Sequence, residues 1–322
     1  FTSFMMGKGI PNSFCGYQKG TDEYKNAIIR FWENVSNHLA ERGWLDKAYY
    51  FIRDEPYVWG DGYDTVLEIK DFAMLLKSAN PNIKIAQTLY VPSYWNEIYQ
   101  ELKDYVDIWI PDLRVINDDV LQDIKDANAE GWTYVCIGNA PCSGHPNYYI
   151  KQPATAPRIF GWMLWKYGLK GNLYYSTTSW TQNPWIDPRH SSWEKQCPGC
   201  AGEGFLLYPP FKEEISPKPC YEGGISSVRW EMVREGIDDY EYLWTLQHYI
   251  DISDAPASMK QHAWQVLNDT VSMIYSGKRS WCKDPLKIYE ARRKIAREIE
   301  NLSAYIYMDI SPPNTEIIES PE

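Results

Sequence analysis

The sequence predicts an α/β protein, specifically a (β/α)8 barrel of the TIM type whose first strands are missing from the 322 residues given. Short apolar runs alternate with amphipathic helical patterns along most of the chain, which is the pattern of repeated β/α units. The connections between the runs have the length that parallel strands require. The run Tyr49-Tyr50-Phe51-Ile52 is apolar without alternation, as expected for a strand buried on both faces.

Six strands are expected, near residues 1, 48, 83, 106, 132 and 171. A closed barrel of this type needs eight strands. The chain begins with Phe1 instead of Met, so the simplest interpretation is that two strands lie upstream of it. A six-stranded open, doubly wound sheet is the alternative. No Gly-rich phosphate-binding motif follows any strand, which weakens the nucleotide-binding form of that alternative.

Helical patterns separate the strands. Between residues 22 and 42, apolar side chains recur at positions 24, 28, 31, 35 and 39, with Thr21 placed to cap the start and Gly43 to end it. Further helices are expected over 64–80, 93–104, 118–130, 154–167, 226–250, 256–276 and 284–303, with a long irregular stretch at 177–224. We therefore expect a β/α barrel at 1–250, helices packed on it at 251–305 and a tail at 306–322.

Composition limits the possible partners. Acidic residues outnumber basic ones, 43 to 32, which gives a net charge of −11. This charge argues against nucleic acid or an anionic membrane surface as the main partner. No apolar run approaches the ~18 residues that indicate a membrane span. The chain has 15 Trp and 25 Tyr residues, whose flat rings suit sugars or bases, and the acidic charge favours sugars.

The seven cysteines are an odd number, too sparse for a disulfide scaffold. Cys197 and Cys200 form a CxxC motif, which His190 and Cys220 could complete as a Cys3His zinc site. Because no second CxxC motif is present, local disulfides or buried thiols are favoured, and we expect Cys197, Cys200 and Cys220 to hold a surface loop. No His lies at a strand end beside a metal-ligand partner, so we expect no catalytic metal and no cofactor.

Polar residues at the strand ends are the candidates for chemistry, because catalytic groups of such barrels collect where the strands finish. The strongest signal is Asp54-Glu55, two adjacent carboxylates before Pro56. Successive strand residues normally point to opposite faces, but at a strand terminus both can turn into one cleft. A solvated acidic loop is the alternative. Candidate substrate-binding residues are Tyr90, Asp112, Tyr175 and Trp180, with Trp185 and Glu203 as weaker candidates, and Asp112 could instead cap a loop.

The run from Tyr50 to Pro56, YFIRDEP, resembles the catalytic strand of glycoside hydrolase family 123, the β-N-acetylgalactosaminidases. Later segments agree in order: residues 171–175 with Trp180 resemble the last barrel strand of that family, 202–209 its Gly-rich loop ending Tyr-Pro, and 227–243 its long helix. The resemblance spans roughly residues 48 to 250. Departures are Tyr175, where many relatives carry Trp, the stretch 190–200, which has no counterpart, and the family's N-terminal β-sandwich, which is absent from these residues.

The resemblance implies a substrate-assisted retaining mechanism, in which the 2-acetamido carbonyl of the substrate attacks its own anomeric carbon and forms an oxazoline. Carried over residue by residue, Asp54 would orient the acetamido N–H and stabilise the developing positive charge. Glu55 would protonate the leaving oxygen and later take a proton from water. That role needs a raised pKa, which Asp54 and apolar walls can supply.

We therefore expect a glycosidase that removes β-linked N-acetylgalactosamine, or a close 2-acetamido sugar, from a glycan or glycoconjugate. One alternative is an ordinary two-carboxylate glycosidase acting on 2-hydroxy sugars, with Asp112 as the second carboxylate. Another is a carbohydrate-binding barrel without catalysis. Secretion or display at the cell surface is expected, because such substrates are extracellular. The GxSxG and HExxH motifs are absent, which disfavours esterase and zinc-protease functions.

Overall fold

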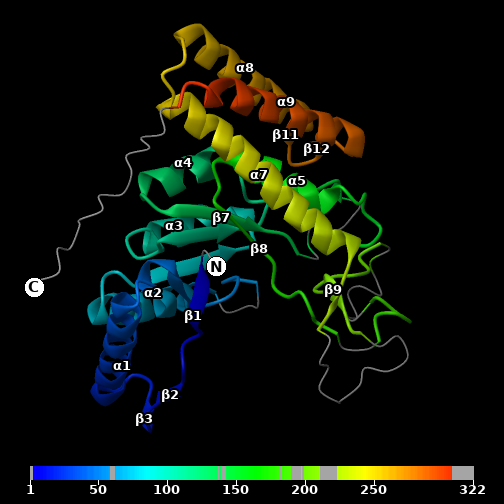
Figure 1. The fold of residues 1–322 in the computed structure, drawn as a ribbon. Helices are drawn as coiled ribbons and strands as arrows, with labels where there is room; N and C mark the ends of the chain where they lie inside the picture. Colours follow the sequence, from blue (N-terminus) through cyan, green and yellow to red (C-terminus); the bar gives the residue numbers. More distant parts are fainter. Residues whose placement is uncertain are drawn as a thin grey trace, which may run out of the picture.

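The computed structural model describes residues 3–58, 62–136, 138, 143–180, 183–189, 197, 199–210 and 223–306. Six parallel strands form one sheet in the order β1-β4-β5-β6-β7-β8 (Figure 1). Their bounds are Phe4–Lys8, Ala48–Phe51, Lys84–Leu89, Ile108–Pro111, Glu130–Tyr134 and Gly171–Leu173. The spatial order follows the chain order without reversal, whereas a doubly wound sheet reverses at a switch point. The sheet is therefore the wall of an incomplete barrel, as the sequence predicts.

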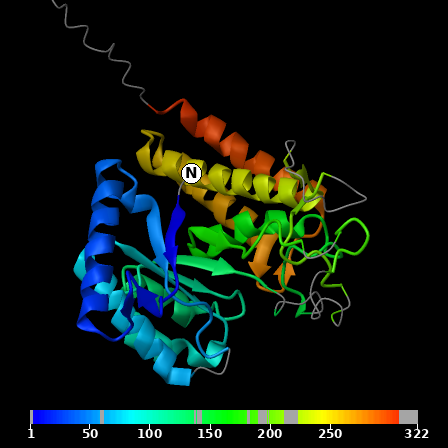
Figure 2. The ribbon, with the colours of Figure 1, turned by 90° about the horizontal axis from the view of Figure 1, so that it is seen from below.

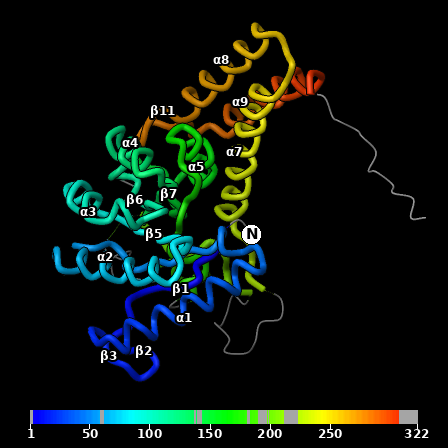
Figure 3. The backbone as a smooth tube through the Cα atoms, turned by 90° about the vertical axis from the view of Figure 1, so that its left-hand side faces the viewer, coloured from blue at the N-terminus to red at the C-terminus, as the bar shows by residue number. Residues whose placement is uncertain are grey.

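One helix follows each strand and covers the outer face of the sheet (Figures 1 and 3). These helices are α1 (Asp22–Glu41), α2 (Gly62–Ala79), α3 (Trp95–Leu102), α4 (Asp118–Asp126), α5 (Ala156–Tyr167) and α7 (Val228–Ile252). Thr21 caps α1 as predicted, since its hydroxyl accepts the Tyr24 N–H at 3.2 Å. The helix expected from residue 93 begins at Trp95, because Pro92–Tyr94 form a 3-10 turn first.

Alternation along the strands decides which side chains face the inside of the barrel wall. A small inner cluster contains Phe51, Ala86, Ile108, Ile110 and Tyr134. Their neighbours in sequence, such as Tyr50, Ile85 and Trp109, belong to the large outer core against the helices. Thr88, two residues after Ala86, therefore shares the inner face, and the inner positions at the strand ends are those available for chemistry.

Helices α8 (Ala257–Ile274) and α9 (Pro285–Ser303) pack outside α5 and α7 (Figure 2). The carboxylate of Asp239 on α7 is fully buried and accepts hydrogen bonds from Arg158 and Trp162 of α5 and from Arg292 of α9. Removing one partner from such a buried network costs about 3–5 kcal/mol, because a charge is left uncompensated. Asp239 therefore ties the C-terminal helices to the barrel wall.

Three short hairpins complete the described structure: β2 (Ser13–Phe14) with β3 (Tyr17–Gln18), β9 (Leu207–Tyr208) with β10 (Ile225–Ser226), and β11 (Tyr275–Gly277) with β12 (Ser280–Trp281). Sequence reasoning missed them, because strands of two or three residues are too short to show an alternating pattern. None of the described helices is long and apolar enough to cross a membrane.

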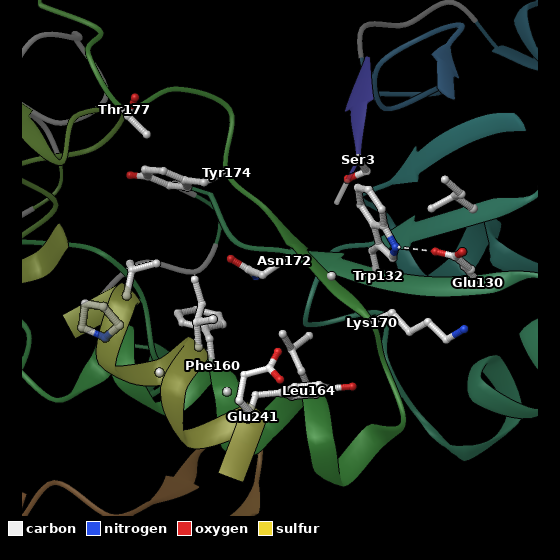
Figure 4. A pocket seen from close by; sticks show the side chains of 18 of the residues that line it. Ser3, Glu130, Trp132, Phe160, Leu164, Lys170, Asn172, Tyr174, Thr177 and Glu241 are labelled. Atoms are coloured by element: carbon white, nitrogen blue, oxygen red, sulfur yellow. Dashed lines mark hydrogen bonds between the residues drawn. The ribbon is translucent and has the colours of Figure 1, made fainter. Parts of the chain in front are cut away.

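A cavity of about 680 Å³ lies along the outer edge of β8, between the starting ends of the strands and helices α5 and α7 (Figure 4). Its lining includes Tyr49, Trp132 and Asn172 from the sheet, with Phe160 and Tyr240 from the two helices. None of the sequence-predicted site residues lines it. In this fold the starting ends of the strands serve stability, but the lining also includes Tyr174 and Thr177, which follow the end of β8.

Candidate active site

Asp54 and Glu55 follow the end of β4 and are held by one side chain of the next strand. The hydroxyl of Thr88 on β5 donates to Oδ1 of Asp54 at 3.0 Å and accepts the backbone N–H of Glu55, also at 3.0 Å. The backbone of Glu55 is left-handed, with φ of 41°. This conformation breaks the alternation of an extended strand, so two consecutive carboxylates can serve the same site.

Tyr134, on β7 three strands away, contacts the carboxylate of Glu55 across the curled inner face of the sheet. Its hydroxyl donates a short hydrogen bond to Oε1. Burial of the carboxyl raises the pKa of Glu55 to about 7. The hydrogen bond from Tyr134 opposes this shift, the negative charges of Asp54 and Asp112 add to it, and the charge of Arg114 opposes it. A carboxyl with a pKa near 7 can donate and accept a proton at neutral pH, as a general acid and base must.

Asp112 follows β6 and is fully buried. Its Oδ1 accepts hydrogen bonds from the backbone N–H and from Nε of Arg114, both at 2.8 Å. The thiol of Cys136 lies 3.8 Å from Oδ2 and stays protonated, because burial raises the pKa of Cys136 far above its ordinary value. Asp112 therefore caps the loop that follows β6, which is one of the two roles that the sequence analysis left open for it.

Tyr90 follows β5 and lies under the guanidinium of Arg114, which is 4.0 Å from the centre of its ring. A cation–π contact of this kind occupies one face of the ring. The guanidinium of Arg114 thus covers one face of the Tyr90 ring. Tyr90 and Asp112 thus join Asp54 and Glu55 in one group of contacts at the ends of β4, β5, β6 and β7.

Tyr175 and Trp180 lie beyond the end of β8 and contact the loop at 199–208. Tyr175 is 53% exposed, and a Cβ added at Gly204 would lie 2.1 Å from its hydroxyl, so only glycine permits this approach. The indole N–H of Trp180 donates to the carbonyl of Leu207 at 2.9 Å. Trp185 likewise donates to Pro209 at 2.9 Å. Tyr175 offers an exposed aromatic surface, whereas the two indoles secure the loop.

Glu203 is 4% exposed and lies between the two groups of residues. The hydroxyl of Tyr149 donates to the carbonyl of Cys136 at 3.0 Å, and burial followed by the charge of Glu203 raises the pKa of Tyr149. Cys136 itself is in electrostatic contact with Asp112, Glu55 and Glu203. Glu203 is therefore a fourth carboxylate of this group, after Asp54, Glu55 and Asp112, and it lies on the β8 side, near Tyr174.

Sequence reasoning missed Thr88, Arg114 and Tyr134. Thr88 carried a usable signal, because it precedes the candidate Tyr90 by two residues and so shares the face of that strand end. Arg114 lies outside any strand and carried no such signal.

Cys197 and Cys200 form a disulfide. Their sulfurs are bonded to each other, which is the local-disulfide alternative and not the zinc site. His190 and Cys220, the other members of the zinc alternative, lie outside the described residues.

A barrel wall that carries two carboxyl groups at one strand end, with the pKa of one of them raised to about 7, is the arrangement of a barrel-type glycosidase. The family model of glycoside hydrolase 123, catalytic domain, matches residues 8–246, about three quarters of the chain. The chain therefore belongs to glycoside hydrolase family 123, and the match covers every residue of the site. A search of curated proteins finds no match to it.

Proposed function

We propose that this glycosidase removes β-linked N-acetylgalactosamine from glycans by substrate-assisted catalysis. The observation that carries the proposal is the Asp54–Glu55 pair held by Thr88, with the pKa of Glu55 raised to about 7. The two carboxylates are adjacent in the chain and are fixed on one side by the same hydroxyl. This arrangement supplies a proton donor and a charge-stabilising group, and it leaves the nucleophile to the substrate.

In the first step the acetamido oxygen attacks the anomeric carbon, and the glycosidic C–O bond breaks. The leaving oxygen takes the bond's electron pair and the proton of Glu55, while Asp54 accepts the acetamido N–H and balances the positive charge of the oxazolinium ring. In the second step water attacks the anomeric carbon and gives its proton to Glu55. The ring C–O bond breaks, which restores the acetamido group with retained configuration.

The main alternative, a two-carboxylate glycosidase, needs a second catalytic carboxylate in contact with the sugar. Asp112 was the candidate, but its side chain is fully buried and both oxygens face Arg114 and Cys136. The burial of Asp112 therefore favours substrate assistance. A binding barrel without catalysis has no use for a glutamate whose pKa is raised to about 7, since maintaining it costs stability.

The test compares three 4-nitrophenyl β-glycosides: N-acetylgalactosaminide, N-acetylglucosaminide and galactoside. We expect turnover of the first, weaker turnover of the second and none of the third. A thiazoline analogue of the oxazoline should inhibit competitively. Equal turnover of the galactoside would contradict substrate assistance, and no turnover of any of the three would contradict the glycosidase proposal.

We also propose that the enzyme acts outside the cell on glycans or glycoconjugates, because 2-acetamido glycans are found there. Fractionation of the source cells, with activity assayed in medium, surface and cytosol, tests this. Activity confined to the cytosol would contradict it.

A further inference from the structure

The hairpin β11–β12 reaches from the C-terminal helices to the active-site end of the sheet. It begins where α8 ends and lies beside α4 and α5 (Figure 3). It also lies outside residues 8–246, which match the family's catalytic domain. At its turn, Nζ of Lys278 donates to the main-chain carbonyl of Arg114 at 3.0 Å and to that of Ile116 at 2.6 Å. A side chain from outside the matched region therefore forms hydrogen bonds with the loop between β6 and α4.

The start of that loop is anchored to the sheet by backbone hydrogen bonds. The N–H of Asp112 donates to Leu89 at 2.7 Å, and the N–H of Leu113 donates to Tyr134 at 3.0 Å, so Asp112 is anchored by the strands. Arg114 lies beyond these ladder bonds. The single ammonium group of Lys278 donates hydrogen bonds to the main-chain carbonyls of both Arg114 and Ile116. Arg114 is therefore held from two sides, because its N–H and Nε bond Oδ1 of Asp112 while its carbonyl accepts a hydrogen bond from Lys278.

The same hairpin rests on a second loop of the site. The indole of Trp281 donates to the carbonyl of Gly144 at 3.1 Å, and the stem of Arg279 packs over Gly144. Three residues on, Asn147 donates to the carbonyl of Cys136 at 3.1 Å. The hairpin thus braces both loops that flank the end of β7.

We propose that Lys278 is a positioning residue of the active site: its ammonium clamps the main chain at Arg114 and Ile116, and so fixes the Arg114 guanidinium against Asp112 and Tyr90 beside Glu55. The inference rests on the proposed role of Glu55 as general acid and base. Charge alone does not explain the arrangement, because Lys278 bonds main-chain oxygens and lies next to other cations. Burial, and then the charge of Arg279, lower the pKa of Lys278, while Asp112 opposes that shift.

Loss of the Lys278 hydrogen bonds should change the pKa of Glu55 in one direction, upward. The groups that face Glu55 are Asp54 beside it, Asp112 and Arg114 from the β6–α4 loop, Tyr134 at the end of β7 and Cys136 just after it. The groups that face Lys278 and Arg114 are Asp112, Tyr90, Arg279 and His145, and burial followed by the three cations lowers the pKa of His145 to about 4. With a pKa of about 4, His145 is neutral near pH 7. Among the residues that the structure describes, Arg114 is the cation that lowers the pKa of Glu55, so its displacement should raise that pKa.

The experiment compares Lys278→Met, Lys278→Arg and Arg279→Gln in the full chain, with an aryl 2-acetamido glycoside as substrate. Lys278→Met should lower kcat about 10-fold with KM changed less than 2-fold. It should also move the basic limb of the kcat/KM–pH profile upward by about half a pH unit, because protonated Glu55 then persists to higher pH. Lys278→Arg, which retains charge and donors, should recover at least half of the lost kcat. Arg279→Gln removes a charge one residue away without removing a loop hydrogen bond, and should stay within 2-fold of the wild type with an unmoved limb.

Two results would overturn the proposal. One is a Lys278→Met enzyme with wild-type kcat and pH limb. The other is an Arg279→Gln enzyme that changes as much as Lys278→Met, since the effect would then come from the electrostatic field and not from the clamp. A wild type without turnover would contradict the proposed function instead. In that case carbon NMR titration of Glu55 in [5-¹³C]glutamate-labelled protein, assigned with Glu55→Gln, still tests the clamp: the pKa of Glu55 must rise in Lys278→Met. Thermal unfolding shows that each variant is folded.

Discussion

Tyr134 on β7 donates its hydroxyl hydrogen to Oε1 of Glu55, which follows β4. In a flat sheet these two strands, three positions apart in the order, would be separated by roughly 14 Å. The hydrogen bond exists because the sheet curls. The proton affinity of Glu55 therefore depends directly on the curvature of the barrel wall.

Removal of that contact should change the pH profile. Tyr134→Phe deletes a hydrogen bond that lowers the pKa of Glu55, so we expect the pKa to rise above about 7 and the basic limb of kcat/KM to move to higher pH. The rate at the optimum should fall about 10-fold, because the carboxyl also loses its orientation. Tyr63→Phe, which removes a hydroxyl bonded to Glu101 on the outer helices, is the matched control. A limb that moves to lower pH would contradict this assignment.

Glu55→Gln should be most harmful with poor leaving groups. Loss of a positioned proton donor typically costs 10²- to 10⁴-fold, and we expect losses in that range with a natural sugar aglycone. An activated aryl group departs with little protonation, so its release should be impaired far less. A leaving-group series in kcat/KM measures the slope. A slope unchanged from the wild type would mean that Glu55 is not the acid.

Asp54→Asn should slow oxazoline formation for every leaving group. The carboxylate that balances the positive charge is replaced by a neutral amide of the same shape, so the loss of roughly 10²- to 10⁴-fold does not depend on the aglycone. The Thr88 hydroxyl can still donate to the amide oxygen, and the variant should remain folded. If good leaving groups restored the activity of Asp54→Asn but not that of Glu55→Gln, the roles assigned to the two residues would have to be exchanged.

The raised pKa of Glu55 also makes stability depend on pH. Between the ordinary value of 4.5 and about 7, the folded protein keeps a proton that the unfolded chain releases, so stability is lost as the pH rises through this window. Glu55→Gln removes that loss. The variant should match the wild type at pH 4.5 and be more stable at pH 8 by about 1–2 kcal/mol, after allowance for solvent screening. Denaturant titrations at the two pH values measure the difference; equal stability at pH 8 would count against burial as the cause.

The Cys197–Cys200 disulfide should affect the loop and not the chemistry. Cys197→Ser with Cys200→Ser opens a very short ring, and we expect a loss of about 2 kcal/mol or less with kcat retained. Adding Cys220→Ser should change kcat no further. Unchanged stability together with lost turnover would show that the thiols take part in catalysis.

The strands, and the position of Asp54 and Glu55 at the end of one of them, were predictable because they rest on local signals. Six apolar runs marked the six strands, and Asp54 and Glu55 stood at the end of one of them. The supporting residues were not predictable, because they act across the sheet: Tyr134 is distant from Glu55 along the chain and meets it only through curvature. Lys278 is further still from Arg114, and no periodic pattern indicates that a hairpin turn will contact a strand-end loop.

The expected sugar contacts show the same limit. Tyr175, Trp180 and Trp185 were selected as aromatics near the last strand, but sequence spacing does not say which ring stays exposed. The structure differentiates them, since the indoles bond main-chain oxygens while Tyr175 remains open to solvent. Whether Tyr175 contacts the sugar stays a prediction.

The left-handed backbone at Glu55 has an evolutionary consequence. A non-glycine residue in this region is disfavoured by about 1–2 kcal/mol, whereas glycine adopts it freely. Folding alone would therefore favour glycine at position 55, and under the proposed role of Glu55 it is selection for hydrolysis that retains a glutamate there. In a lineage released from that selection, drift should replace this residue early. Among descendants of this chain, glycine at position 55 would mark the barrels that bind sugars without cleaving them.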